Sequence, residues 1–422
     1  MQQGKRQGFI DYATPFCRIA SLDYEEQTKP LTFDFSKYGI DLHVGDDDAY
    51  LPLATASDLM ADVGLNNLAY NGRELCLLAG SRATAQDLDP AWYEPIAADE
   101  PRAQDMADYS YDELCFVMDT LYSCSGKGIL DEDIASKGFD ATLSEKDELT
   151  QRVRELVKST DKAEYFAGLA ILGQYVANGH TYLTDATLTG SLDDELSKRV
   201  MEIKTELDEA FAEKDYTKVY EETMALLLDE EAPNQRSEIW ADGASYHEQG
   251  DTAVISLDSF SGCDHEGWDA FYAGTGARPD GSNTPDLIGT LLTDLEKAKS
   301  NPDIRYVVID LSANGGGSND LCATALAILT GRVQTPARDL VTGQRFNIVY
   351  DVDTLFDGSF NATAAASGHN VDFAVLTSCY SFSCANYFPS LMRDVGVPII
   401  GEVSAGGTYM LVRLVTLDGQ CL

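Results

Sequence analysis

The sequence VDFAVLTSCYSFSCANYFP, residues 371–389, decides the fold. Val371–Leu376 has the apolar character of a buried strand, small residues then form a turn, and apolar residues at helical spacing follow over Ala385–Val395. This order predicts that Ser383 stands at the N-terminus of a helix, where backbone N–H groups converge and stabilise negative charge. Ser383 is then either a nucleophile, with the amide of Cys384 in an oxyanion hole, or an ordinary N-cap serine.

A second motif, VVIDLSANGGG, occupies residues 307–317. An apolar strand ends in Asp310, and glycines precede a predicted helix. Successive glycines let the backbone approach a ligand closely and present its N–H groups, so Gly316 and Gly317 are candidates for an oxyanion cradle. No Gly-Lys-Ser/Thr follows, which excludes a P-loop. The alternative is a tight strand-to-helix turn without a ligand.

The third motif is Asn178-Gly179-His180-Thr181, at the end of a predicted helix over Ala163–Val176. His180 is one of five histidines, and a helix C-terminus is expected to raise its basicity. It is a candidate general base. The alternative is a capping or internally satisfied histidine.

Composition excludes several classes of protein. The 422 residues carry 30 Lys and Arg against 70 Asp and Glu, a net charge of -40, which argues against nucleic acid or an anionic membrane as a partner. The nine cysteines show neither a disulfide framework nor zinc-ligand spacing, so no metal is expected. No apolar run reaches the roughly 18 residues of a membrane helix, and the N-terminus lacks a signal-peptide core.

Three regions differ in pattern. Residues 1–95 carry short alternating runs at Leu31–Phe35, Tyr38–Val44 and Ala49–Leu53 and one helix near Ala56–Val63, which predicts a small β-rich module. Residues 105–235 are dominated by helical periodicity, for example over Glu148–Val157, and carry Gly-His-Thr. Residues 237–422 alternate strands and helices, which predicts an α/β domain with a largely parallel sheet. The predicted strands here are Thr252–Phe260, Tyr306–Leu311, Phe373–Leu376, Pro398–Glu402 and Tyr409–Leu417, and the predicted helices are Pro285–Lys299, Asp320–Leu329 and Ala385–Val395.

The motifs and their order resemble the S41 peptidases, a family that includes the C-terminal processing proteases, the tricorn core and the interphotoreceptor retinoid-binding repeats. The resemblance covers residues 105–422 and rests on Gly-His-Thr, on Ile-Asp-Leu-x-x-Asn-x-Gly-Gly, on Phe-Ser-x-Ala and on Ile-Gly-Glu-x-Ser-Ala-Gly. It implies a crotonase/ClpP-like α/β catalytic domain.

The same resemblance implies roles for individual residues. Ser383 matches the family nucleophile, and His180 matches the general base of the tricorn-like branch. The amide of Cys384, with that of Gly316 or Gly317, matches the oxyanion hole. No cofactor is implied.

The sequence also departs from the family. Tail-specific proteases use a Ser–Lys dyad, and their lysine position is Gly407 here, which excludes that mechanism. Gly179 occupies the place of the serine that precedes the histidine in the tricorn-like branch, and Ser312 replaces the arginine of Asp-Leu-Arg. The family's downstream glutamate would lie beyond Leu422, so either the catalytic domain is truncated at its C-terminus as given or the acid is supplied by a different residue.

The leading interpretation is a serine endopeptidase that hydrolyses peptide bonds through an acyl-enzyme on Ser383, with His180 as general base and peptides or proteins as substrates. The alternative is an inactive S41-like module that binds a peptide or an apolar ligand. A third hypothesis is a crotonase-like acyl-CoA enzyme, but the acidic surface of this protein disfavours CoA as a ligand. The resemblance favours a place in the cell envelope or outside the cell, and the sequence leaves substrate specificity and oligomeric state open.

Overall fold

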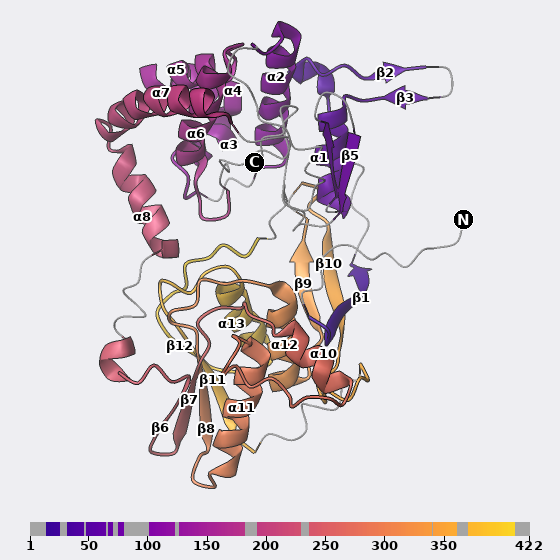
Figure 1. Ribbon diagram of the computed structural model, residues 1–422, viewed down its shortest axis with the longest axis vertical. Coiled ribbons are helices and arrows are strands. Elements are labelled where there is room, and N and C mark those ends of the chain that lie inside the picture. Colours follow the sequence, from indigo (N-terminus) through magenta and orange to yellow (C-terminus); the bar gives the residue numbers. More distant parts are fainter. Residues whose placement is uncertain are drawn as a thin grey trace. The chain divides into compact units, whose positions relative to one another are not determined.

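The chain folds into two compact units, drawn in Figure 1 from a computed structural model. One unit comprises Pro30–Met224 with the two chain ends, and the other comprises Tyr12–Lys29 and Ala225–Tyr409. The structure describes residues 14–25, 32–45, 48–64, 66–70, 75–79, 101–122, 126–181, 192–228, 236–339, 341–360 and 370–409.

Helices build most of the first unit. They are α2 (Gln104–Thr120), α3 (Asp131–Lys137), α4 (Phe139–Glu145), α5 (Glu148–Val157), α6 (Lys162–Val176), α7 (Asp194–Ala212) and α8 (Tyr216–Leu228). The side chain of Asp147 accepts hydrogen bonds from the amides of Leu149 and Thr150, and this capping box starts α5 at the residue that periodicity predicts. The apolar faces of these helices form one buried core around Phe139, Tyr165 and Tyr175.

The N-terminal part of this unit is less regular than the predicted β-rich module. It contains a 3-10 turn η1 (Phe35–Tyr38), the strands β2 (His43–Val44) and β3 (Ala49–Tyr50), the helix α1 (Leu53–Gly64), and the strands β4 (Asn66–Tyr70) and β5 (Leu75–Ala79). Each strand pair is antiparallel, and the helix expected near Ala56–Val63 is present. The strand expected from residue 38 to 44 is confined to its last two residues, because a 3-10 turn and Gly39, at φ 68°, precede them.

Glu113 of α2 is a buried acid, 3% exposed, beside Thr55 and Tyr109. Burial raises the pKa of its carboxyl from 4.5 to about 7, although the neighbouring polar groups of Thr55 and Tyr109 oppose the rise. The stabilisation that the neutral acid gives is therefore fully present below about pH 4.5 and is lost as the pH rises through about 7.

We expect Glu113→Gln to match the wild type in free energy of unfolding near pH 4.5 and to exceed it by on the order of 3 kcal/mol at pH 8. Denaturant unfolding of both proteins at the two pH values measures this difference. A difference that does not change with pH would contradict the assignment.

A five-stranded sheet organises the second unit. Its strand order is β12 (Ile399–Gly401), β11 (Asp372–Thr377), β8 (Tyr306–Asp310), β7 (Thr252–Ser256) and β6 (Tyr246–Gln249). Neighbouring pairs from β12 to β7 are parallel, and β6 is antiparallel to β7. The predicted α/β fold with a largely parallel sheet is confirmed, whereas the strand expected at Tyr409–Leu417 lies outside the described residues apart from Tyr409.

The helices of this unit are α10 (His265–Tyr272), α11 (Leu287–Ser300), α12 (Asn319–Thr330) and α13 (Cys384–Asp394). The three predicted helices correspond to α11, α12 and α13. Every residue of α12 from Asp320 to Leu329 is buried, which makes it the central helix of this unit's core.

A second, antiparallel sheet contains β1 (Cys17–Tyr24), β10 (Arg345–Val352) and β9 (Gln334–Arg338), in that order. Residues 17–24 lie within the N-terminal module that the sequence predicts, but their strand belongs to the second unit. Packing explains this position: the ring of Phe16, just before β1, lies 4.9 Å from that of Trp268 and 5.7 Å from that of Phe356, and both Phe16 and Trp268 are fully buried.

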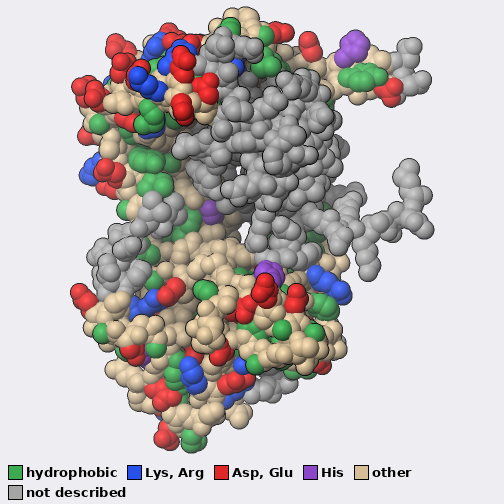
Figure 2. Space-filling model, viewed as in Figure 1, with side chains coloured by type: hydrophobic (Ala, Val, Ile, Leu, Met, Phe, Trp, Pro, Cys, Tyr) green, Lys and Arg blue, Asp and Glu red, His purple; other side chains and the backbone are tan. Residues whose placement is uncertain are grey.

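Acidic side chains are spread over the described surface of both units on the face drawn in Figure 2, with basic side chains among them. This distribution fits a solvated acidic surface better than one acidic binding patch. Among the described residues, no helix is both long and apolar enough to cross a membrane.

Candidate active site

Two of the three sequence motifs meet at one edge of the parallel sheet. Strands β8 and β11 are neighbours, and both motifs follow their carboxyl ends. The amide of Leu311 donates to the carbonyl oxygen of Leu376 at 2.9 Å, which holds the two turns together where the strands end. The carboxyl edge of such a sheet is where α/β proteins form ligand sites.

Ser383 has a strained backbone, with φ 53° and ψ −118°. Such a conformation in a residue other than glycine costs roughly 1–3 kcal/mol and persists only where neighbouring groups enforce it. Here the amide of Ser383 donates to the carbonyl of Gly406 at 2.9 Å, and its own carbonyl accepts from the amides of Asn386 and Tyr387. These bonds fix the serine between β11 and α13.

The side chain of Ser383 does not cap the helix that follows it. Ser383 occupies the N-cap position of α13, but its hydroxyl makes no cap hydrogen bond. The half-buried hydroxyl also makes no hydrogen bond to any other described residue. The N-cap alternative therefore explains where Ser383 stands but not the conformation or the uncommitted hydroxyl.

Gly316 and Gly317 both require the absence of a side chain. Gly316 has φ 105°, and a Cβ built on it would lie 2.6 Å from Cβ of Ser383. Gly317 has φ 136°, and its Cβ would lie 2.3 Å from the carbonyl oxygen of Phe260. The glycine-rich turn thus brings bare backbone directly against the serine.

Asn314 joins the two turns, a role that the sequence analysis did not assign to it. Its side chain is fully buried, donates to the carbonyl of Leu257 at 2.8 Å and accepts from the amide of Gly316 at 2.8 Å. Its backbone carbonyl accepts from the amide of Phe382 at 3.2 Å. The only signal in the sequence was an amide side chain directly before three glycines, which also fits an exposed turn.

The backbone amides around Ser383 differ in whether they already donate a hydrogen bond within the protein. The amide of Gly316 donates to Asn314, whereas those of Gly317 and Cys384 make no hydrogen bond to a described residue. The thiol of Cys384 also donates to the carbonyl of Gly317 at 3.1 Å, which links the two residues. Oxyanion holes are built from backbone N–H groups of this kind, which are free to donate to a substrate oxygen.

Gly407 leaves no room for a lysine. It has φ 73°, and a Cβ there would lie 2.2 Å from Cε2 of Phe382. The neighbouring Gly406 forms a parallel bridge with Phe382, which fixes this backbone. A side chain at position 407 would have to displace the residue next to Ser383.

His180 lies in the first unit, in the turn that follows α6. Gly179 has φ 91°, and the side chain of Asn178 accepts from the amides of His180 and Thr181 at 3.0 and 2.8 Å. The expectation of raised basicity is wrong: burial, followed by the positive charge of Lys127, lowers the pKa of the His180 imidazole from 6.5 to about 4. The imidazole is therefore neutral at neutral pH, which is the form that accepts a proton.

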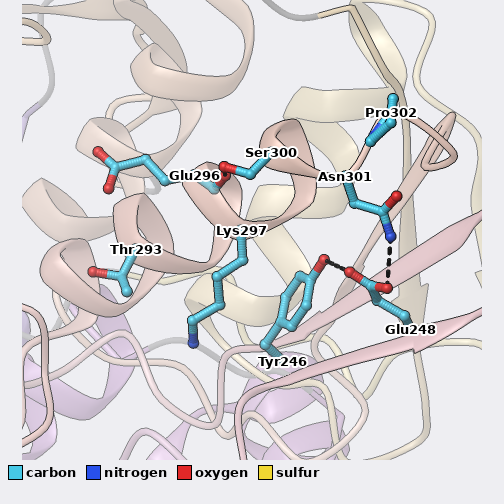
Figure 3. Close-up of a pocket in the computed structure, with 8 residues that line it drawn as sticks. All are labelled: Tyr246, Glu248, Thr293, Glu296, Lys297, Ser300, Asn301 and Pro302. Atoms are coloured by element: carbon cyan, nitrogen blue, oxygen red, sulfur yellow. Dashed lines mark hydrogen bonds between the residues drawn. The ribbon is translucent and has the colours of Figure 1, made fainter.

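A surface pocket of the second unit lies away from these residues (Figure 3). It is formed between β6 and the end of α11, and Asn301 and Pro302 at its rim precede β8, whereas the turns described above follow β8. Its central carboxylate, Glu248, accepts from the hydroxyl of Tyr246 at 2.5 Å and from the side-chain amide of Asn301 at 2.8 Å. The pocket contains none of the predicted site residues.

The mixed α/β fold of the second unit, with its largely parallel sheet, is the fold of an S41 peptidase domain. Residues 251–421 match the family model of peptidase family S41. No curated protein matches the sequence significantly.

Similar solved structures include a lipoprotein from Streptococcus agalactiae, at 14% identity and a TM-score of 0.37, covering 76% of this chain and 84% of that one. A putative peptidase from Parabacteroides merdae is 14% identical with a TM-score of 0.42, covering 76% and 81%. The photosystem II D1 C-terminal processing protease is 17% identical with a TM-score of 0.26, covering 40% and 35%.

Proposed function

We propose that the protein is a serine-type endopeptidase that cleaves peptides or proteins through an acyl-enzyme on Ser383. The observation that carries the proposal is the conformation of Ser383: a strained backbone presents a hydroxyl without a hydrogen bond to any described residue, beside two uncommitted amides. Strain of this kind is typical of functional residues, and a helix cap would not need it.

In the proposed reaction, Oγ of Ser383 attacks the carbonyl carbon of the scissile peptide bond, and the imidazole of His180 takes the hydroxyl proton. The amides of Cys384 and Gly317 stabilise the oxyanion of the tetrahedral intermediate. His180 then gives the proton to the leaving amine, and water releases the acyl group by the reverse sequence of proton transfers. Gly316 serves this scheme through its lack of a side chain, because its amide is committed to Asn314.

The alternative, an inactive module that binds a peptide or an apolar ligand, is favoured by one feature. Gly179, in the position where the tricorn-like branch has a serine, has φ 91°, a conformation in which a serine would be strained. The tetrad of that branch is therefore not formed in this turn. For either function we propose a location in the cell envelope or outside the cell, on the family resemblance.

A fluorophosphonate probe tests the proposal, because it phosphonylates only activated serines. We expect the probe to react with the wild-type protein, and peptide mapping by mass spectrometry to place the adduct on Ser383. Ser390→Ala is the matched control, because Ser390 lies on the same helix with its hydroxyl bonded to the carbonyl of Tyr387. This variant should react like the wild type, and heat-unfolded protein should not react. Folded wild-type protein that stays unlabelled would favour the binding module.

A further inference from the structure

Asp131, the first residue of α3, is more heavily hydrogen-bonded than a helix start requires. Its carboxylate is 1% exposed, and Oδ2 accepts from the amides of Gly126, Lys127 and Gly128 at 2.8, 3.1 and 3.0 Å. Oδ1 accepts from the hydroxyl of Tyr122 at 2.5 Å. The buried carboxylate of Asp131 thus fixes the loop 126–128 and also accepts a hydrogen bond from the hydroxyl of Tyr122.

Tyr122 connects this carboxylate to the end of α6. Its single hydroxyl proton lies nearest Asp131, with the carbonyl of Val176 a second acceptor at 3.0 Å. The lone pairs of the same oxygen face Asn178, whose side-chain amide donates to it at 3.3 Å. The phenol therefore bridges α3 and the turn after α6.

Asn178 extends the connection to His180. Its side chain is 5% exposed, and while its nitrogen donates to Tyr122, its oxygen accepts from the amides of His180 and Thr181. Because both the nitrogen and the oxygen of the Asn178 side chain form hydrogen bonds, the orientation of this side-chain amide is fixed. The backbone of His180 is in this way tied to Asp131 through two side chains.

The same carboxylate also places a charge near the imidazole. Lys127 lies in the loop that Asp131 holds, and its positive charge is one of the two causes that lower the pKa of His180. The hydroxyl of Thr223, on α8, also donates to the carbonyl of Lys127 at 3.3 Å. Both loops, the one with Lys127 and the one with His180, are thus held by one buried group.

We propose that Asp131 and Tyr122 are positioning residues for His180: acting through Asn178, they hold the turn that carries its imidazole. This inference rests on the proposed function, in which His180 is the base. The network reaches the backbone of His180 and of its neighbour Thr181 directly, through the side-chain oxygen of Asn178.

Tyr122→Phe tests the proposal, because it removes only the bridging oxygen. We expect kcat for peptide hydrolysis to fall about tenfold with KM unchanged within twofold, since a base that is aimed less well affects the chemical step. We also expect the imidazole resonances of His180, assigned by comparison with His180→Gln, to move in the NMR spectrum.

Tyr216→Phe is the matched control. It removes a comparable hydrogen bond in the same unit, from the Tyr216 hydroxyl to Asp147 at 2.5 Å, which does not involve the His180 turn. This variant should leave both kcat and the His180 resonances unchanged. If Tyr122→Phe does not fold, Asn178→Ser replaces it, because a serine can still accept from the turn amide but cannot reach Tyr122.

The two readouts separate this proposal from the proposed function. If the wild type has no peptidase activity, the NMR comparison decides alone: a shift of the His180 resonances in Tyr122→Phe but not in Tyr216→Phe supports positioning. Unchanged resonances in Tyr122→Phe overturn it. In an active protein, shifted resonances with an unchanged kcat also overturn it, because the aim of the imidazole would then not matter to the reaction.

Discussion

Ser383→Ala is expected to lower kcat/KM for peptide hydrolysis by roughly 10⁴- to 10⁶-fold, because no acyl-enzyme can form without the hydroxyl. Folding should be unaffected, since the hydroxyl bonds to no described residue. His180→Ala alone should cost a similar factor, because an unactivated serine hydroxyl is a weak nucleophile. Steady-state kinetics on a fluorogenic peptide, with melting temperatures as the control for folding, measures both losses.

The double variant, Ser383→Ala with His180→Ala, is the sharper measurement. Residues that act as one unit are strongly non-additive, so adding His180→Ala to Ser383→Ala should lower kcat/KM no further. Because the two residues belong to different units of the chain, this result would show that both units act on one substrate molecule. Losses that multiply in the double variant would contradict a Ser383–His180 pair.

Gly316→Ala is expected to abolish fluorophosphonate labelling and to lower kcat/KM by at least about 100-fold, as expected when an oxyanion hole is disturbed. The added methyl group would lie 2.6 Å from Cβ of Ser383 and 3.1 Å from the amide nitrogen of Cys384. At φ 105° the alanine is also strained, so a lower melting temperature is expected as well.

Gly315→Ala is the matched control for this prediction. A Cβ on Gly315 meets no atom within 4 Å, and its φ lies outside the strained positive range. Its kinetics and labelling should stay within about twofold of the wild type. If the two alanine variants behave alike, the close approach of the glycine turn to Ser383 has no part in the reaction.

Regular, strongly periodic segments could be predicted from the sequence. The strands β8 and β11 are continuous apolar runs, and α5 begins at a capping box, so each was found within one residue or two. The helices α3 and α4 are seven residues long, too short for a periodic signal. The strand β9, with the sequence QTPAR, has neither alternation nor an apolar run, and only its pairing with β10 makes it a strand.

The site residues that belong to short sequence motifs could be predicted, whereas the properties that depend on tertiary packing could not. Ser383 and the glycines were found because each motif lies at the end of a strand. The pKa of His180 was predicted in the wrong direction because a helix terminus contributes about 0.3–1 kcal/mol, less than one pKa unit. Burial, which a sequence does not display, lowers that pKa from 6.5 to about 4 and so outweighs the terminus.

During synthesis, the strand β1 is made long before the strand with which it pairs. Its Arg18 pairs with Asp351 of β10, which follows 333 positions later. At roughly 5–20 residues per second, the ribosome needs on the order of 20 to 70 seconds to make that partner. Throughout that interval β1 has an unpaired edge, while the whole first unit is synthesised and can fold. The antiparallel sheet of the second unit therefore cannot form until β10 has been made, long after β1.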